Sequence, residues 1–199
     1  MSKIKKWPLS LAMVALWLLL SGATPSFVQD EAQILTPATR LLIQEKNERY
    51  QKRHEPVRLI VKTVHRLTLK ASKFKPAAKT VIIAVGQKGK KRNVRLFVSS
   101  DLKRILTPTF CDALIQSKVT ALRSQDRTTF NDGLKFVFKA CATKIDQAYS
   151  YPKDRQTDLD TDTMSQIEHP RRVTLPMALL IGVLVMVLLG WLKKQRQKG

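Results

Sequence analysis

The residues with the clearest chemical potential are cations gathered in the middle of the chain. Residues 56–100 contain twelve Lys or Arg and no Asp or Glu. An unbalanced run of this kind attracts phosphate and carboxylate groups, so we predict an anion-binding surface, although a merely solvated face is also typical of such a run. The residues predicted to form the surface are Lys70, Lys73, Lys75, Lys79, Lys88, Lys90, Lys91, Arg92 and Arg95.

Two cysteines are the other side chains that could do chemistry. Cys111 and Cys141 are the only cysteines of the chain, and each falls on the predicted apolar face of a helix. In an oxidising compartment they could form a disulfide that closes a loop of about 30 residues; two buried free thiols are the alternative. Three scattered histidines make a poor metal set, so the residues themselves predict no resident cofactor.

Local patterns predict the elements that must position these residues. Thr36-Pro37 is typical of a helix start, with Thr as N-cap and Pro at the first helical position. A continuous apolar run such as Val81–Val85 is typical of a strand buried on both faces. The predicted order is a helix over 36–53, a strand over 57–64, a polar segment over 66–80, strands over 81–85 and 94–98 around a turn at 86–92, and helices over 107–122 and from 128 or 129 to 148.

The last helix is predicted from a single apolar stripe. Leu134, Val137, Phe138, Cys141, Ile145 and Ala148 recur at helical spacing. Together with the strands, this pattern predicts an α/β fold, a three-layer sandwich in which helices flank both faces of a small mixed sheet.

The two ends of the chain predict its compartment. Residues 1–23 begin with lysines, continue with an uncharged apolar stretch and end with Ser21-Gly22-Ala23, which is typical of a signal peptide; an uncleaved signal anchor is the alternative. Residues 173–192 carry no charge and are long enough for a transmembrane helix. Four cations follow them and two precede them, which predicts a cytoplasmic tail over 193–199. An extracytoplasmic domain over 24–150 and a polar, acidic stalk over 151–172 lie between.

Several strings in the middle of the chain resemble the TPM domain family, which is often described as acid-phosphatase-like. Residues 28–36, VQDEAQILT, are similar to the opening motif of that family. Residues 80–85, TVIIAV, resemble its central strand, and residues 94–96, VRL, the strand after it. The segments Leu102–Leu114 and Phe130–Leu134 resemble the approaches to its last helices. The likeness covers residues 28–148 and implies the same α/β fold.

The resemblance also implies a phosphatase site that this sequence only partly retains. Metal-assisted phosphate-ester chemistry needs carboxylates that converge on a cation, and the resemblance carries over only Asp30 and Asp101 as weak catalytic candidates. The family usually has a glycine where Gln33 stands and an Asp-Asn-Gly-like turn where Ala77-Ala78-Lys79 stands. The resemblance therefore implies a divalent cation only if the chain is enzymatic.

These observations predict a non-catalytic interaction module at the cell envelope. The basic hairpin would dock on anionic lipid headgroups, on a wall polymer or on a membrane-protein partner. Nucleic acid is not expected, because the predicted compartment is extracytoplasmic and no aromatic residues interleave the charges in the sequence. The alternative prediction is a divalent-metal-dependent, acid-phosphatase-like hydrolase.

Overall fold

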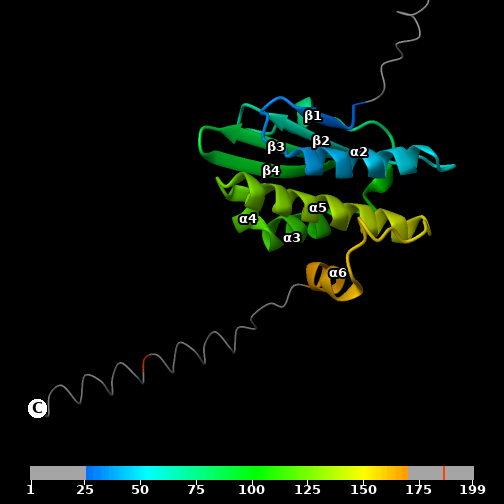
Figure 1. Cartoon of the computed structure of the whole chain (residues 1–199). Helices are drawn as coiled ribbons and strands as arrows, with labels where there is room; N and C mark the ends of the chain where they lie inside the picture. The colour runs from blue at the N-terminus through cyan, green and yellow to red at the C-terminus, as the bar shows by residue number, and fades with distance from the viewer. Residues whose placement is uncertain (1–25, 170–185, 187–199) are drawn as a thin grey trace, which may run out of the picture. The chain divides into compact units, whose positions relative to one another are not determined.

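The structure is a computed structural model that describes residues 26–169 and Met186. Its first half holds the strands and α2, and helices make up its second half (Figure 1). The elements are β1 (Val28–Asp30), α2 (Pro37–Gln51), β2 (Arg58–Val64), the 3-10 turn η1 (Ala71–Lys73), β3 (Thr80–Lys88), β4 (Lys91–Val98), the 3-10 turn η2 (Ser100–Leu102), α3 (Pro108–Ser117), α4 (Val119–Arg123), α5 (Arg127–Ala148) and α6 (Thr161–Glu168).

The four strands form one mixed sheet in the order β1-β2-β3-β4. β1, β2 and β3 run parallel, and β4 returns antiparallel to β3. The apolar run predicted as the central strand lies in β3, where Val81, Ile83 and Val85 are fully buried. The predicted α/β class with a small mixed sheet is confirmed, and β4 forms one edge of that sheet.

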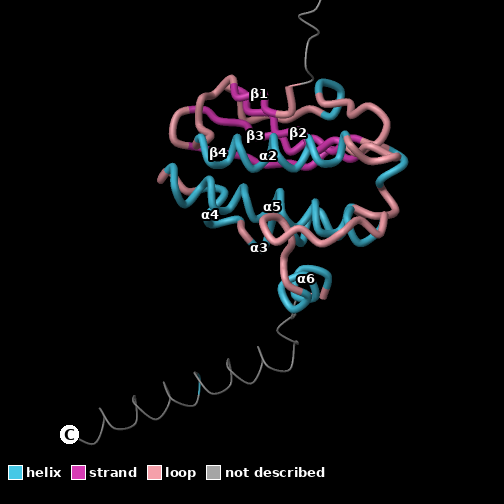
Figure 2. Tube along the Cα trace, turned by 45° about the vertical axis from the view of Figure 1, so that its right-hand side comes forward, coloured by secondary structure: helices cyan, strands magenta, loops and turns pink. Residues whose placement is uncertain are grey.

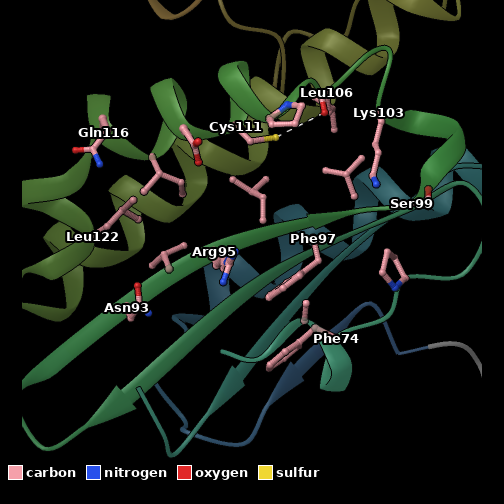
Figure 3. Close-up of a pocket in the computed structure, with 18 of the residues that line it drawn as sticks. Phe74, Asn93, Arg95, Phe97, Ser99, Lys103, Leu106, Cys111, Gln116 and Leu122 are labelled. Carbon is pink, nitrogen blue, oxygen red and sulfur yellow. Dashed lines mark hydrogen bonds between the residues drawn. The ribbon is translucent and has the colours of Figure 1, made fainter. Parts of the chain in front are cut away.

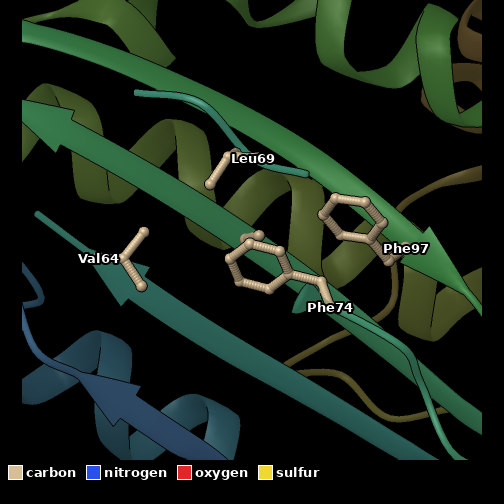
Figure 4. Packing of buried hydrophobic residues seen from close by; sticks show 5 residues of the cluster. Val64, Leu69, Phe74 and Phe97 are labelled. Atoms are coloured by element: carbon tan, nitrogen blue, oxygen red, sulfur yellow. The ribbon is translucent and has the colours of Figure 1, made fainter. Parts of the chain in front are cut away.

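Helices cover one face of the sheet, and an irregular segment covers the other (Figures 1 and 2). On the second face, Leu69 and Phe74 pack against Ala84 and Phe97 of the sheet (Figure 4). The prediction of helices on both faces is therefore wrong. The second face of a sheet this small needs only a narrow apolar cover, and two large side chains on a polar segment supply it.

The hairpin between β3 and β4 is tighter than the sequence predicted. The strands continue through the predicted turn, and Lys88 pairs with Lys91. Only Gly89 and Lys90 are left as the loop, and Gly89 adopts a left-handed φ of 56°. Gly86, predicted to lie in the turn, belongs to β3 instead. A Cβ at Gly86 would clash with the carbonyl oxygen of Arg66. The absence of a side chain at Gly86 therefore allows the segment that covers the sheet to approach β3 closely.

The helices begin where their capping residues predicted. Thr36 and Thr107 accept hydrogen bonds from the backbone N–H groups of Thr39 (3.3 Å) and Phe110 (3.2 Å). The helix predicted over 107–122 is broken at Lys118 into α3 and α4. α5 begins at Arg127, just before the predicted start, because Asp126 is its N-cap. Its predicted stripe is buried except at Ala148.

The acidic segment that we predicted as a stalk begins as part of the domain. Residues 151–159 belong to the same compact unit as the sheet. Asp154 is paired with Arg49 of α2, and the Tyr151 hydroxyl donates a hydrogen bond to the carbonyl of Glu55 (2.7 Å). α6 follows in a second unit and is capped by Asp160, which accepts a hydrogen bond from the Thr163 N–H (2.7 Å).

The predictions for the two ends of the chain lie outside the described residues. These are the signal peptide over 1–23, the cytoplasmic tail over 193–199, and the transmembrane helix over 173–192, of which only Met186 is described. Among the residues that the structure does describe, no helix has the length and apolar character to cross a bilayer.

Candidate functional site

A groove of about 830 Å³ runs along β4 (Figure 3). Every residue from Arg92 to Ser100 lines it, so both faces of this edge strand contribute. The segment 71–76 forms one wall, and α3 and α4 form the other. The apolar part of the lining consists mainly of Val94, Leu96, Val98, Leu106, Ile115, Val119 and Leu122.

The groove is rimmed by positive charge. Lys75, Arg95, Lys103 and Arg123 line it and are exposed. Asp112 is the one acidic residue among its lining residues in the described part of the chain. An apolar floor with cations at its rim suits an anionic ligand that also carries apolar groups.

Arg92 also lines the groove, but its side chain serves the fold. Its guanidinium donates hydrogen bonds to the Ser124 carbonyl and to the Gln87 side chain (3.1 Å), and lies 4.4 Å from the ring centre of Phe130. Burial lowers the pKa of Arg92, although Asp126 nearby opposes this effect. These contacts fasten β4 to the start of α5, so Arg92 is not free to bind a ligand.

Arg95 is held in place by an aromatic pair. The rings of Phe74 and Phe97 stack with centres 5.1 Å apart and planes 9° apart. Arg95 lies 5.5 Å from the centre of Phe97, and Arg66 lies 5.8 Å from the centre of Phe74. The four side chains follow the order Arg66, Phe74, Phe97 and Arg95, with a cation at each end of the aromatic pair. Such a contact is worth about 0.5–1 kcal/mol at an exposed site, so it favours a position of the Arg95 side chain beside the ring at the groove.

The nine predicted anion-binding residues do not form one surface. Three of them, Lys75, Arg92 and Arg95, line the groove. Lys88, Lys90 and Lys91 lie at the turn of the hairpin. Lys70 precedes η1 and Lys73 is its last residue, and both side chains are exposed. Lys79 is at the far end of β3, about 30 Å from Lys88 at strand spacing, and is paired with Glu55 at 2.8 Å.

Sequence reasoning missed two cations of the groove. Lys103 follows η2, and Arg123 ends α4. Both lie outside the acid-free run over 56–100, and the chain brings them to β4 only because α3 and α4 pack beside that strand. The sequence did contain a signal for this arrangement. The predicted helix over 107–122 is the next element after the hairpin, and consecutive elements are usually neighbours in space.

Both cysteines are buried free thiols, which is the second of the two alternatives given by the sequence. Cys111 lines the groove, and its Sγ lies 3.8 Å from the Leu106 carbonyl oxygen. Burial, with a smaller effect of Asp112, raises the pKa of Cys111 to about 12. The thiol is therefore protonated at neutral pH and is a poor nucleophile.

Asp30 stands at the end of β1 and organises the turn that follows. Its carboxylate accepts hydrogen bonds from the N–H groups of Ile34 and Leu35 (both 3.1 Å) and from the Thr63 hydroxyl (2.7 Å). Arg40 completes the set with an ion pair of 2.6 Å. The side chain is 5 % exposed, so its oxygens are already occupied by the protein itself.

Comparison with known proteins places this arrangement in a family. A model of the TPM domain matches residues 28–144, which is more than half of the chain. The chain belongs to the TPM domain family. Among solved structures, the N-terminal domain of a protein from P. gingivalis, determined by solution NMR, has a similar fold with a TM-score of 0.52 and 15% identity. The match covers 69% of this chain and 92% of that one. No curated protein matches the chain.

The two carboxylates implied by the TPM resemblance lie at opposite ends of the sheet. Asp30 is level with Thr63 and, across β2, with Val85. Asp101 accepts a hydrogen bond from the N–H of Lys79 (2.7 Å), just before β3 begins. Six residue steps along the chain separate these levels, about 20 Å. Within the described residues, no cluster of three or more His, Cys, Asp or Glu could hold a metal ion. The two carboxylates therefore cannot share a cation.

Two turns hold a residue other than glycine in a backbone conformation that favours glycine. Gln33 and Lys79 have φ values of 53° and 52°, in the left-handed region that disfavours side chains. Gln33 stands where the resemblance implies a glycine, and Lys79 ends the Ala77–Lys79 turn where it implies a glycine-containing one. At both positions a glycine would adopt the observed backbone without this strain.

A glycine at position 33 is expected to stabilise the domain. Gln33→Gly would relieve a left-handed strain of about 1–2 kcal/mol and add some chain entropy to the unfolded state. We expect a net gain of about 0.5–1 kcal/mol in the free energy of unfolding, measured by urea denaturation of the full chain. The control is Gln44→Gly in the middle of α2, which we expect to lower that free energy by about 1 kcal/mol.

Proposed function

We propose that this TPM domain is a non-catalytic binding module that recognises an anionic ligand along the groove beside β4. The observation that carries the proposal is the composition of the groove: exposed Lys75, Arg95, Lys103 and Arg123 surround an apolar floor. The net charge of +21 adds long-range attraction for anions. The contact of Arg95 with the Phe97 ring favours one position of this side chain before a ligand arrives, which would reduce the side-chain entropy lost on binding.

The proposal includes the compartment and the partners predicted from the sequence. A signal peptide and a single C-terminal anchor would present the domain outside the cytoplasm, at the cell envelope. Anionic lipid headgroups, a wall polymer and acidic stretches of a membrane-protein partner all carry the chemistry that the groove favours. The exposed lysines of the hairpin turn, Lys88, Lys90 and Lys91, would assist through charge alone.

The test compares two charge reversals of equal size. The full chain in nonionic detergent is titrated against fluorescently labelled polyphosphate and polyglutamate at 50 and 200 mM salt. We expect Arg95→Glu/Arg123→Glu to weaken binding at least about tenfold, and binding by the natural chain to weaken as salt rises. The control, Lys52→Glu/Lys153→Glu, changes the net charge equally at exposed positions outside the groove.

Two results would contradict the proposal. Equal losses in the groove variant and the control would mean that net charge, and not the groove, governs binding. Turnover of para-nitrophenyl phosphate that depends on magnesium, manganese or calcium would favour the hydrolase alternative. We expect no metal-dependent turnover, because Asp30 and Asp101 lie at opposite ends of the sheet.

A further inference from the structure

The backbone of β4 offers a row of hydrogen-bonding groups to the groove. β4 is the last strand of the sheet. The Ser99 N–H donates to the carbonyl of Thr80 (3.0 Å), so it points toward β3. Because backbone groups alternate in direction along a strand, the N–H and C=O groups of Val94, Leu96 and Val98 point away from β3, into the space beside the edge.

We propose that the groove takes an extended acidic segment of another protein, which adds to the sheet as a strand beside β4. This inference rests on the proposed function and names its ligand. The pocket follows the strand without interruption from Arg92 to Ser100, as a strand-shaped ligand requires. Backbone pairing would supply affinity, and side chains on alternate faces would supply specificity.

The two faces of β4 predict the pattern of the incoming segment. On the helical face, Val94, Leu96 and Val98 continue into the apolar walls of α3 and α4. On the opposite face, Arg95 and Lys75 are exposed. Because side chains of a strand alternate between faces, the segment should alternate apolar residues, toward the helices, with acidic residues, toward Arg95.

Charge argues against a second copy of this chain as the occupant. β4 itself carries Lys91, Arg92 and Arg95 among its eight residues. Pairing two copies of this strand would bring like charges together across the new interface, which is unfavourable. Edge cations of this kind prevent strands from joining indiscriminately. The same cations attract an acidic strand. The edge of β4 therefore disfavours pairing with a second β4 and favours pairing with an acidic segment.

A synthetic peptide tests the inference directly. The probe is a nine-residue fluorescent peptide of alternating valine and glutamate with capped ends, titrated against the full chain in nonionic detergent. Two further versions are N-methylated on one or the other set of alternate amides. Only one set would face β4 in a paired strand, so we expect one version to bind at least about tenfold more weakly than the other.

Hydrogen exchange and a charge reversal identify the place of binding. The amides of Val94, Leu96 and Val98 should exchange at least about tenfold more slowly in the complex. Arg95→Glu should weaken peptide binding at least about tenfold, and Lys52→Glu, an exposed residue outside the groove, should change it less than about twofold. A peptide with lysine in place of glutamate should not bind.

The outcomes separate this inference from the proposed function. If the two N-methylated peptides bind equally, strand addition is wrong while groove-dependent anion binding stands. If polyphosphate binds in the groove and the peptide does not, the acidic segment is not the ligand, while groove-dependent anion binding again stands. If neither binds, both proposals fail. Dimerisation that the peptide cannot reverse, seen by sedimentation velocity, would assign the edge to a second copy.

Discussion

Lys46→Met is expected to lower the free energy of unfolding by about 3–5 kcal/mol. Lys46 lies on α2 with its side chain 4% exposed, and its Nζ is 2.5 Å from Asp146 of α5 and 3.6 Å from Asp154. Burial raises the pKa of Asp146, while Lys46 and a hydrogen bond from Tyr50 (2.8 Å) oppose that shift. Removing the ammonium would leave a buried carboxylate without its main partner.

A second substitution distinguishes lost charge from lost packing. Asp146→Asn keeps an acceptor for the Tyr50 hydroxyl but removes the charge that Lys46 neutralises. We expect Lys46→Met/Asp146→Asn to be more stable than Lys46→Met alone, and urea unfolding of the full chain followed by circular dichroism measures both. A cost below about 1 kcal/mol for Lys46→Met would mean that the pair is solvated and weak.

Asp30→Ala is expected to lower the free energy of unfolding by about 2–4 kcal/mol at pH 7. The substitution removes the shared acceptor of Ile34, Leu35 and Thr63 and leaves Arg40 without its partner. The exposed Asp132, which pairs with the neighbouring Lys135, provides the control. Asp132→Ala should cost less than about 0.5 kcal/mol.

The cost of Asp30→Ala should shrink in acid. Burial raises the pKa of Asp30, but the hydrogen bonds from Thr63, Arg40, Leu35 and Ile34 outweigh it and leave the pKa below its usual value. A lowered carboxyl pKa contributes stability above the unfolded value of about 3.9, and that stability is lost as pH falls through the folded value. Unfolding at pH 7, 5 and 3 should show the natural chain and the variant converging, and an unchanged gap would contradict this account.

This role also bears on how activity data should be interpreted. If Asp30→Asn or Asp30→Ala abolished a phosphatase signal, the loss would follow equally from a disordered turn over 31–35. Stability therefore has to be measured beside activity for every variant of this residue. A loss of turnover in a variant that still folds, with its metal affinity altered, is the result that would restore Asp30 as a catalytic candidate.

Local sequence patterns predicted most of the fold because local physics determines it. Thr36 and Thr107 cap helices through their own side chains, and the unbroken run in β3 reflects burial on both faces. The cover over the second face could not be predicted in the same way. Leu69 and Phe74 are isolated apolar residues in a polar segment. Their position on the sheet is determined by long-range packing with Ala84 and Phe97, which no local pattern indicates.

The candidate site was predicted less well, because nearness in sequence was equated with nearness in space. Lys79 precedes β3 and Lys88 ends it, so the length of the strand separates them. Lys103 and Arg123 are distant in sequence and yet share the groove with Arg95. The burial of Lys46 is a further case. A lysine in a helix ordinarily indicates the solvent-exposed face of that helix, and the partner of Lys46, Asp146, lies 100 residues away in the sequence.

The packing of residues 151–159 determines where a shortened protein can end. The family match stops at residue 144, but the carboxylate of Asp154 and the buried Thr157 lie beyond that point. A fragment cut at 144 would also lose Asp146, and one cut at 150 would keep it while uncovering Lys46 and Arg49. The compact unit therefore extends to Leu159, and a fragment for solution studies should include the chain up to that residue.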